Sequence, residues 1–166
     1  MFREMRRKNQ KMNHEDCIAV LKRGTSGVLA VSGDEGYPYA VPLSYVYNEG
    51  KIYFHCAMQG HKVDAVRNCD KASFCVIDRD EVISETYTTH YRSVIAFGRV
   101  RVIDDDRQKL AAIRMLADRY SPDEGVERRE KEIEGALGRL CMIEMTIEHM
   151  TGKEAVELVK EKRRAE

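Results

Sequence analysis

Between residues 26 and 56 the chain alternates short apolar runs with turn sequences rich in glycine and acidic residues. The runs GVLAVS, YPYAVPLSYVY and KIYFHC are separated by the turns GDEG and NEG. Runs rich in β-branched and aromatic residues favour strands, and short glycine turns join antiparallel neighbours. This segment therefore predicts three strands in an antiparallel meander. It restricts the fold to those built on a mainly antiparallel sheet.

The remaining segments predict helices around further strands. Asn13 precedes Glu15 and Asp16 and is typical of a helix N-cap, and Gly24 ends that helix. Gly98 interrupts a β-rich run and indicates a bulge or bend. After the meander we expect a helix at 61–67, strands at 71–78 and within 80–105, helices from 105 and from 126, and a half-exposed strand at 139–150.

These elements predict a mainly β fold with flanking helices. About six strands are enough to roll into a small barrel. A chain of 166 residues can bury a core without disulfides, and we expect a single domain over 1–166. Its ends are polar: an N-terminal arm covers about 1–12 and a C-terminal tail about 156–166, where a loosely docked helix is expected.

The charge and hydropathy patterns exclude several classes of partner. Lysine and arginine number 28, as do aspartate and glutamate, so no overall field draws the protein to nucleic acid or to an anionic membrane. The apolar runs are too short to span a bilayer. The opening MFREMRRKNQKMN lacks the apolar centre of a secretion signal, and we expect a cytoplasmic protein.

The cysteines favour reduced thiols over disulfides or a metal site. The five are an odd number, are widely scattered and form no CxxC pair. A zinc site would have to combine His55, Cys56 and His61. In a strand, however, His55 and Cys56 point to opposite faces, so no metal site is predicted.

The run YPYAVPLSYVY has two different faces. Alternation places bulky residues on one face and mostly small residues on the other. Pro42 lacks a backbone donor and predicts an edge, a bulge or an opening of the sheet. A small-residue face beside a gap in the ladder could admit a flat ligand. The alternative is that the bulky face is core and the small face packs against a helix.

The sequence QGHK, residues 59–62, stands between a strand and a helix. A helix start carries unpaired N–H groups and the positive end of the dipole, so His61 and Lys62 would complete a small anion pocket there. The candidate anion is a phosphate. The alternative is that Gly60 makes the turn while the two basic residues are solvated surface residues.

Three motifs carry a resemblance to a known family. They are G-x-P-Y-x-V-P-L-x-Y-V-Y, Y-F-H-x-A-x-x-G-x-K, and the T-G-K near the end. In this order the chain resembles the pyridoxamine 5'-phosphate oxidase-like flavin proteins, and more narrowly the nitroimidazole-resistance (Nim-type) branch, over roughly residues 5–155. The resemblance implies a split β-barrel that forms a homodimer and holds FMN between the subunits.

The resemblance also implies roles for particular residues. It places one strand along the flavin, comprising Val41, Pro42, Leu43, Ser44 and Tyr45. Phe54 and His55 match the strand end near the ribityl and phosphate groups, and His61 and Lys62 match the phosphate clamp. Ser93 matches a polar position near the isoalloxazine ring.

The sequence departs from the true oxidases at two of these positions. Val41 stands where they have an arginine, and His61 replaces the clamp arginine. An imidazole loses its charge near neutral pH, whereas a guanidinium keeps it, so weaker and pH-dependent FMN binding is expected. The chain also lacks the arginine-rich C-terminal segment that holds pyridoxamine phosphate in the oxidases. Oxidation of that vitamin is therefore not expected.

Two function classes remain open from the sequence. The first is an FMN-dependent oxidoreductase that reduces a small electron acceptor such as a nitro-aromatic compound, with no side-chain nucleophile. Its candidate substrate-side groups, each with an equally good structural reading, are Tyr45, His55, His90 and Tyr91, while His14 and His149 are interpreted as structural. The second is a non-catalytic FMN or haem binding or sensor protein. A homologue that has lost its cofactor is a third possibility.

Overall fold

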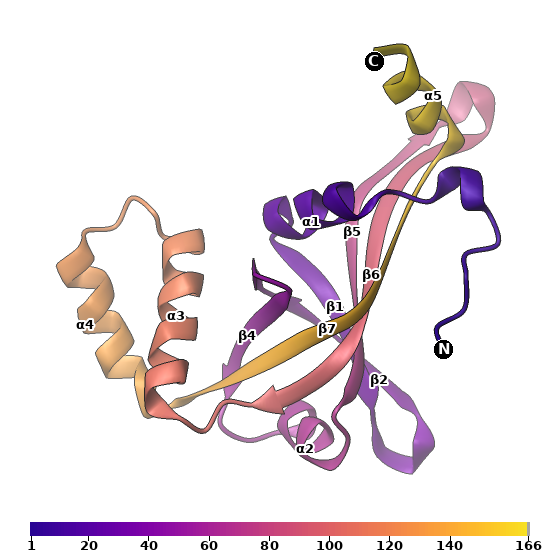
Figure 1. Ribbon diagram of the computed structural model, residues 1–166. Helices are drawn as coiled ribbons and strands as arrows, with labels where there is room; N and C mark the ends of the chain where they lie inside the picture. The colour runs from indigo at the N-terminus through magenta and orange to yellow at the C-terminus, as the bar shows by residue number, and fades with distance from the viewer. Residues whose placement is uncertain (166) are drawn as a thin grey trace.

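The computed structural model describes residues 1–165 and contains one seven-stranded sheet in which all neighbouring strands are antiparallel (Figure 1). Its strands are β1 (Ser26–Ser32), β2 (Pro38–Ser44), β3 (Val46–Asn48), β4 (Lys51–Ala57), β5 (Lys71–Ile83), β6 (Thr88–Val102) and β7 (Leu140–Glu154). The helices are α1 (His14–Arg23), α2 (His61–Asn68), α3 (Asp106–Tyr120), α4 (Val126–Leu137) and α5 (Val156–Ala165). The mainly β fold with flanking helices is thus confirmed. Glu166, the last residue of the predicted tail, lies outside the described residues.

The strand order forces the sheet to roll up. The order is β2-β1-β5-β6-β7-β4-β3, so β2 and β3 form opposite edges. In the chain these two strands are separated by Tyr45 alone. The Cα atoms that flank a single residue are at most about 7 Å apart, so the two edges must meet there. The sheet therefore closes into a barrel that remains split between β2 and β3.

The predicted strand at 37–47 is accordingly two strands, and the predicted three-strand meander was wrong: the segment forms two separate hairpins, β1–β2 and β3–β4, at opposite edges of the sheet. The prediction of one continuous strand was wrong because Tyr45 leaves the ladder and turns its side chain into the core, where it is fully buried. The tyrosine hydroxyl donates a hydrogen bond of 2.8 Å to the Leu21 carbonyl oxygen. A local alternation pattern does not reveal that this position is where a barrel closes.

Most other local predictions are confirmed. Asn13 caps α1, with its Oδ1 accepting a 2.7 Å hydrogen bond from the Asp16 amide. The segment 71–102 is a hairpin of two long strands. The register of β6 against β7 shifts at Gly98, where a Cβ atom would collide with the Thr146 carbonyl oxygen. Glycine is required there because the two backbones approach so closely.

The prediction of a half-exposed last strand was wrong over its first part. All residues from Cys141 to Met145 are buried, on both faces of β7. One face contributes to the barrel core, with Phe54, Phe74 and Ile143 among its fully buried residues. The other face lies under α3, where Met142 packs with Leu116 in a second apolar cluster.

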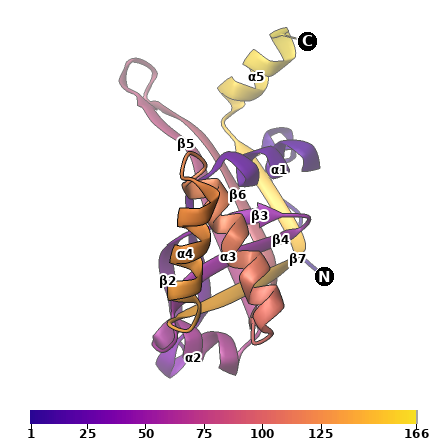
Figure 2. The same ribbon diagram turned by 90° about the vertical axis from the view of Figure 1, so that its left-hand side faces the viewer.

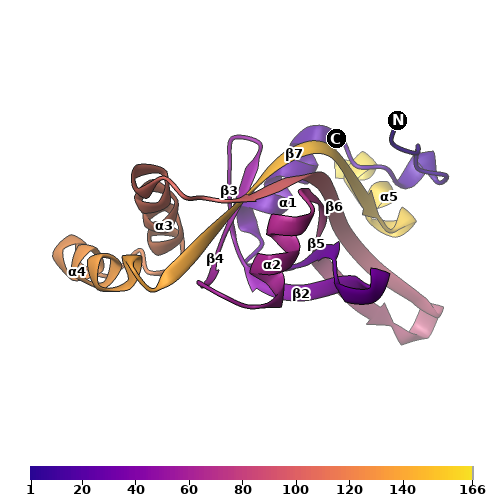
Figure 3. The same ribbon diagram turned by 90° about the horizontal axis from the view of Figure 1, so that it is seen from below.

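Two appendages extend from opposite sides of the barrel. Figures 1 and 3 show α3 and α4 as a hairpin on one side and the end of the β5–β6 hairpin on the other. Figure 2 shows α3 and α4 side by side. Ion pairs join the two helices, Arg114 with Glu130 and Arg129 with Asp118, and the Lys109 ammonium caps α4 by donating to the Leu137 carbonyl oxygen at 2.6 Å.

The C-terminal tail is a docked helix rather than a loose one. Leu158 of α5 is buried, and Lys162 forms an ion pair with Asp16 of α1. Within residues 1–165, no helix is long and apolar enough to cross a membrane.

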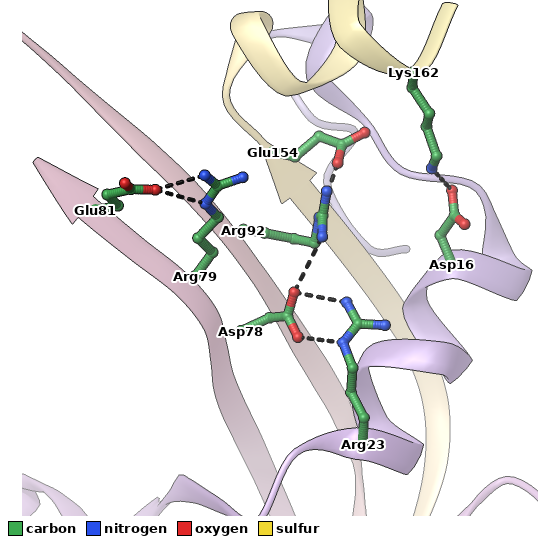
Figure 4. A network of polar contacts seen from close by, with 8 residues as sticks. All are labelled: Asp16, Arg23, Asp78, Arg79, Glu81, Arg92, Glu154 and Lys162. Carbon is green, nitrogen blue, oxygen red and sulfur yellow. Dashed lines mark hydrogen bonds and ion pairs between the residues drawn. The ribbon is translucent and has the colours of Figure 1, made fainter. Parts of the chain in front are cut away.

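A polar network ties α1 to the three long strands (Figure 4). Asp78 of β5 accepts two hydrogen bonds from Arg23, at 2.5 and 2.6 Å, and one from Arg92 at 3.3 Å. Arg92 also donates to the buried Glu154 of β7 at 2.9 Å. Burial opposes the charge of Asp78, but its bonds to the two arginines outweigh burial and hold the pKa of Asp78 below its ordinary value.

We expect Asp78→Asn to lower the free energy of unfolding by about 2 kcal/mol near neutral pH, because an amide leaves two guanidinium groups without their carboxylate. The folded pKa lies below the unfolded one, so the contribution of Asp78 is full above the unfolded value and is lost as pH falls through the folded value. The difference between variant and wild type should therefore shrink below about pH 4. Urea unfolding across this pH range measures it. Asp80→Asn, an exposed change on the same strand, is the control, and an equal loss in both variants would contradict the assignment.

Candidate functional site

β2 has one face in the core and one outside. Tyr39, Val41 and Leu43 are half-buried and pack against the barrel core. Ala40, Pro42 and Ser44 lie on the outward, exposed face. Pro42 is on an edge strand, as its missing donor predicted. The bulky face is therefore core, and within residues 1–165 the small face of β2 remains exposed, which leaves it available to a ligand or a partner.

The outward face continues with small and apolar residues across four strands. The strand register places Pro42 opposite Val28, Val28 opposite Cys75, and Cys75 opposite Ile95. The next row runs parallel to the first, through Ala40, Ala30, Ser73 and Phe97. Ser93 follows Ile95 on this face by alternation. The predicted ring-side residue Ser93 and the predicted flavin strand thus share one surface.

This surface is hollowed at one end. A cavity of 570 Å³ lies where Ala30, Ser73 and Phe97 meet Phe2 of the N-terminal arm. Phe2 stacks on His149, with ring centroids 4.5 Å apart. The arm therefore packs on the sheet by an aromatic contact.

The helix start predicted as an anion pocket is present. Gly60 precedes α2 with φ 132°, a conformation that residues with a side chain rarely adopt, and its carbonyl oxygen accepts from the Val63 and Asp64 amides. No side chain caps this end of α2. The first N–H groups of the helix are therefore left for water or an anion.

The two basic residues of QGHK point in different directions. The His61 ring stacks on Tyr39, with centroids 4.1 Å apart, and its Nε2 lies 3.6 Å from a carboxylate oxygen of Asp34. Lys62 instead lies near Cys56 at the end of β4, where its charge partly offsets the effect of burial, which raises the pKa of that thiol to about 11. His61 thus borders the turn between β1 and β2, and Lys62 borders β4.

A second cavity, of 410 Å³, brings Ser44 and His55 together. It lies between the split edge of the barrel and the α3–α4 hairpin, and we call it the hairpin cavity. Its helical wall is mostly apolar and comprises Ile113, Leu116, Ala117, Tyr120, Glu132, Ile133 and Ala136, with Leu140 of β7 completing it. Two predicted cofactor residues from different strands therefore border one space.

Tyr120 holds the split edge in place. The Tyr45 amide donates to the Tyr120 hydroxyl at 3.1 Å, and this hydroxyl lies 2.8 Å from the Tyr45 carbonyl oxygen and 2.5 Å from that of Thr25. Next to it, Arg119 donates to the carbonyl oxygens of Arg23 and Gly24. Tyr120 thus presents its ring to the cavity while its hydroxyl is committed to the backbone.

Two predicted cofactor residues have no exposed side chain. Tyr45 and Phe54 are fully buried and make edge contacts with Phe74 in the core. Any contact that they make with a ligand must come from their backbone atoms. Burial is also the main cause that raises the pKa of Tyr45, so its phenol is not suited to exchange a proton with a substrate.

The other candidate polar residues lie away from the hairpin cavity. Tyr91 accepts a 3.0 Å hydrogen bond from Gln10, and the Lys153 ammonium lies 5.2 Å from its ring centroid. His90 lies opposite Glu81 on the β5–β6 hairpin. His149 packs beside Phe2, consistent with its structural interpretation. The structure groups none of these with Ser44 and His55 around the hairpin cavity.

The cysteines of this chain are free thiols. Cys56 and Cys141 lie opposite each other on β4 and β7, with Cys141 in the core, while His55 faces outward. Within residues 1–165, no three His, Cys, Asp or Glu side chains are grouped so that they could hold a metal ion.

The family model for pyridoxamine 5'-phosphate oxidase matches residues 13–154. The chain belongs to this family. The match includes β1 to β7 and the helices between them, so it covers both the split edge and the α3–α4 hairpin. A comparison with curated proteins gives no match.

Solved structures share this family's fold. A candidate 5-nitroimidazole antibiotic resistance protein from Bacteroides thetaiotaomicron is 18% identical, with a TM-score of 0.74 over 86% of this chain and 85% of that one. The conserved protein Rv2991 from Mycobacterium tuberculosis is 14% identical, with a TM-score of 0.77 over 91% and 90%. An FAD and haem binding protein from Mycobacterium smegmatis is 21% identical, with a TM-score of 0.73 over 89% and 74%. At these identities the likeness shows the split-barrel fold.

Sequence reasoning missed the helical wall of the hairpin cavity. Helical spacing of the apolar residues at 110–120, which include Ile113, Leu116 and Tyr120, predicts a helix there but not that it lines a cavity. The available signal was a tyrosine at the end of that helix, since a tyrosine at an apolar contact usually finds a hydrogen-bond partner for its hydroxyl. Which backbone it would meet depends on the closure of the barrel.

Tyr120→Phe should lower the free energy of unfolding by about 1–3 kcal/mol, because the buried Tyr45 amide and the Thr25 carbonyl lose their partner. Urea unfolding measures the loss, and amide hydrogen exchange at residues 43–46 should become faster. Tyr37→Phe removes a hydroxyl from a side chain that is 75% exposed and serves as the control. Unchanged exchange at the split edge would show that Tyr120 does not hold it.

Proposed function

We propose that this protein is an FMN-binding flavoprotein that transfers electrons to a small acceptor such as a nitro-aromatic compound. The observation that carries the proposal is the outward face of β2, with its small residues Ala40, Pro42 and Ser44 beside the hairpin cavity. A planar ring can lie on such a face without displacing bulky side chains. Family membership and the flavin-binding relatives support the same conclusion.

The residues present fit the anionic end of FMN. The uncapped start of α2 offers backbone N–H groups, and Lys62 adds a permanent positive charge beside it. His61 stands at the same helix start but is held by Tyr39 and Asp34. We assign the main electrostatic role to Lys62 and a smaller role to His61, whose ring is already engaged by Tyr39 and Asp34.

When bound, the flavin supplies the electron transfer. The protein residues bind and orient. Pro42 and Ser44 would support the ring from β2, whereas Ser93 lies on the same outward face but three strands away, about 14 Å at the usual strand spacing, too far to bond to a ring on β2 of the same subunit. His55 is exposed at the hairpin cavity and is the side chain placed to hold or donate a proton there.

We further propose a homodimer that buries the outward sheet face. Val28, Ile95 and Ile77 expose 37%, 38% and 65% of their surface on this face and form a band over adjacent strands. Contiguous exposed apolar residues are typical of an interface. A flavin lying on β2 next to this band would be covered by the partner, which supports the interfacial site that the family resemblance implies.

The first experiment is an absorption spectrum before and after addition of excess FMN and desalting. Retained flavin bands support the proposal, and the loaded protein is then assayed with NADH or NADPH and nitro compounds. A protein that retains no added FMN contradicts it. One relative binds FAD and haem, so a Soret band without flavin bands would favour the alternative, a non-catalytic haem-binding protein of the same fold. Retained FMN without turnover would favour a flavin carrier or sensor.

Replacing His61 and Lys62 together with alanine should weaken FMN binding about 10- to 100-fold, the cost of charge-assisted hydrogen bonds to phosphate. The single Lys62→Ala change should account for most of this loss. Fluorescence quenching of FMN measures the affinities. The exposed pair Lys22→Ala and Lys131→Ala is the control, and equal affinities in both double variants would remove the clamp assignment.

Ile95→Glu should convert the proposed dimer into a monomer and lower FMN retention, because it places a charge in the middle of the apolar band. Light scattering after size exclusion measures the mass. Val126→Glu changes an equally apolar residue on α4, 65% exposed, and should leave the mass unchanged. If wild type and Ile95→Glu have the same mass, the band is not the interface.

A further inference from the structure

One side of the hairpin cavity is formed by α3 and α4, two helices that have no role in the proposed flavin site. Its volume of 410 Å³ falls within the usual range for small-ligand pockets, roughly 300–1,000 Å³. Ser44 and His55 form its strand side, so a molecule inside it would lie against the proposed cofactor residues. The cavity is therefore positioned to hold the second reactant.

The walls indicate what kind of molecule fits. Six of the lining residues are aliphatic, namely Ile113, Leu116, Ala117, Ile133, Ala136 and Leu140. Tyr120 adds an aromatic surface whose hydroxyl is already bonded. Such walls favour an apolar ring and offer it few hydrogen bonds.

The permanent charge of the cavity lining is negative, and His55 on its strand side adds a positive charge only when it is protonated. Among the described residues that line it, Glu132 alone carries a permanent charge, and none is lysine or arginine. Three arginines of the two helices are engaged elsewhere: Arg114 with Glu130, Arg129 with Asp118, and Arg119 with the carbonyl oxygens of Arg23 and Gly24. An anionic ligand would meet an uncompensated carboxylate there.

We infer that the hairpin cavity is the acceptor pocket, that it selects ring compounds that are cationic or neutral over anionic ones, and that Glu132 sets this preference. The inference rests on the proposed function for the role of the pocket, since the acceptor takes electrons from the flavin beside it. The charge preference itself requires only the cavity. A phosphorylated or carboxylated acceptor is disfavoured.

Three probes of similar shape test the preference: 4-nitrobenzyltrimethylammonium, 4-nitrobenzyl alcohol and 4-nitrobenzoate. Their equilibrium binding to the full-length protein is measured by calorimetry, with and without added FMN. We expect the cation to bind best and the carboxylate worst. Glu132→Gln should reduce the cation-to-anion affinity ratio about fivefold at low salt, and high salt should remove most of the difference in wild type. Glu134→Gln is the charge control, because Glu134 is exposed on the same helix as Glu132 but lies outside the cavity lining.

The location is tested separately by filling the cavity. Ala136→Trp should weaken binding of all three probes at least tenfold, whereas Glu134→Trp, which adds the same bulk outside the lining, should not. If the protein retains flavin, the rates at which the three probes reoxidise the reduced protein should follow the same order as their affinities.

Several results would overturn the inference. Equal binding of cation and anion, or equal effects of the two glutamine variants, would remove the role of Glu132. Probe binding that Ala136→Trp does not alter would show that the probes bind elsewhere. If Ala136→Trp also lowers the mass measured by light scattering relative to wild type, a second copy of the chain covers the cavity instead. Flavin retention is measured on the same preparations. If wild type retains flavin but binds the three probes equally, only the acceptor-pocket inference is refuted. If it binds the probes with the expected preference but retains no flavin, only the proposed function is refuted.

Discussion

The closure of the barrel at Tyr45 is the constraint on which the rest of the structure depends. Because one residue joins strands at opposite edges of the sheet, no continuous ladder can run across this point. The backbone groups of Tyr45 therefore need other partners, and the Tyr120 hydroxyl provides them. The α3–α4 segment, inserted between β6 and β7, thus supplies the hydrogen bonds that the backbone lacks between β2 and β3. This contact holds α3 and α4 beside the split edge, and the hairpin cavity lies between the helices and that edge.

The same constraint separates the roles of the two faces of β2. The inward face is needed to fill the barrel, which is why Tyr39, Val41 and Leu43 are large. The outward face does not fill the barrel and carries small residues. Because β2 is an edge strand, Pro42 can stand there without breaking a hydrogen bond between strands. A flat ligand can use that face because Ala40 and Pro42 are exposed, and Ser44 at its end borders the cavity shared with α3 and α4. Fold and candidate site therefore follow from one feature.

The sequence predicted what depends on nearby residues and missed what depends on distant ones. The Asn13 cap, the turns of the meander and the bulge at Gly98 each follow from a few consecutive residues, and the structure contains them. The break at Tyr45 and the burial of both faces of β7 depend on barrel closure and on α3 folding back over β4 and β7. The hairpin cavity is of the second kind, because Ser44, His55 and Tyr120 come from three separate segments. Strand alternation and helical spacing do not predict which residues from separate segments line the same cavity.

The position of the polar network suggests that stability and binding are largely independent in this chain. Asp78, Arg92 and Glu154 link α1 to the three long strands, and the lining of the hairpin cavity includes none of them. The link between the two regions is Arg23, whose side chain pairs with Asp78 while its carbonyl oxygen accepts from Arg119. The carbonyl contact does not depend on the identity of the side chain at position 23. Changes in the network should therefore alter the free energy of unfolding more than the geometry of the split edge, where backbone atoms make most of the contacts.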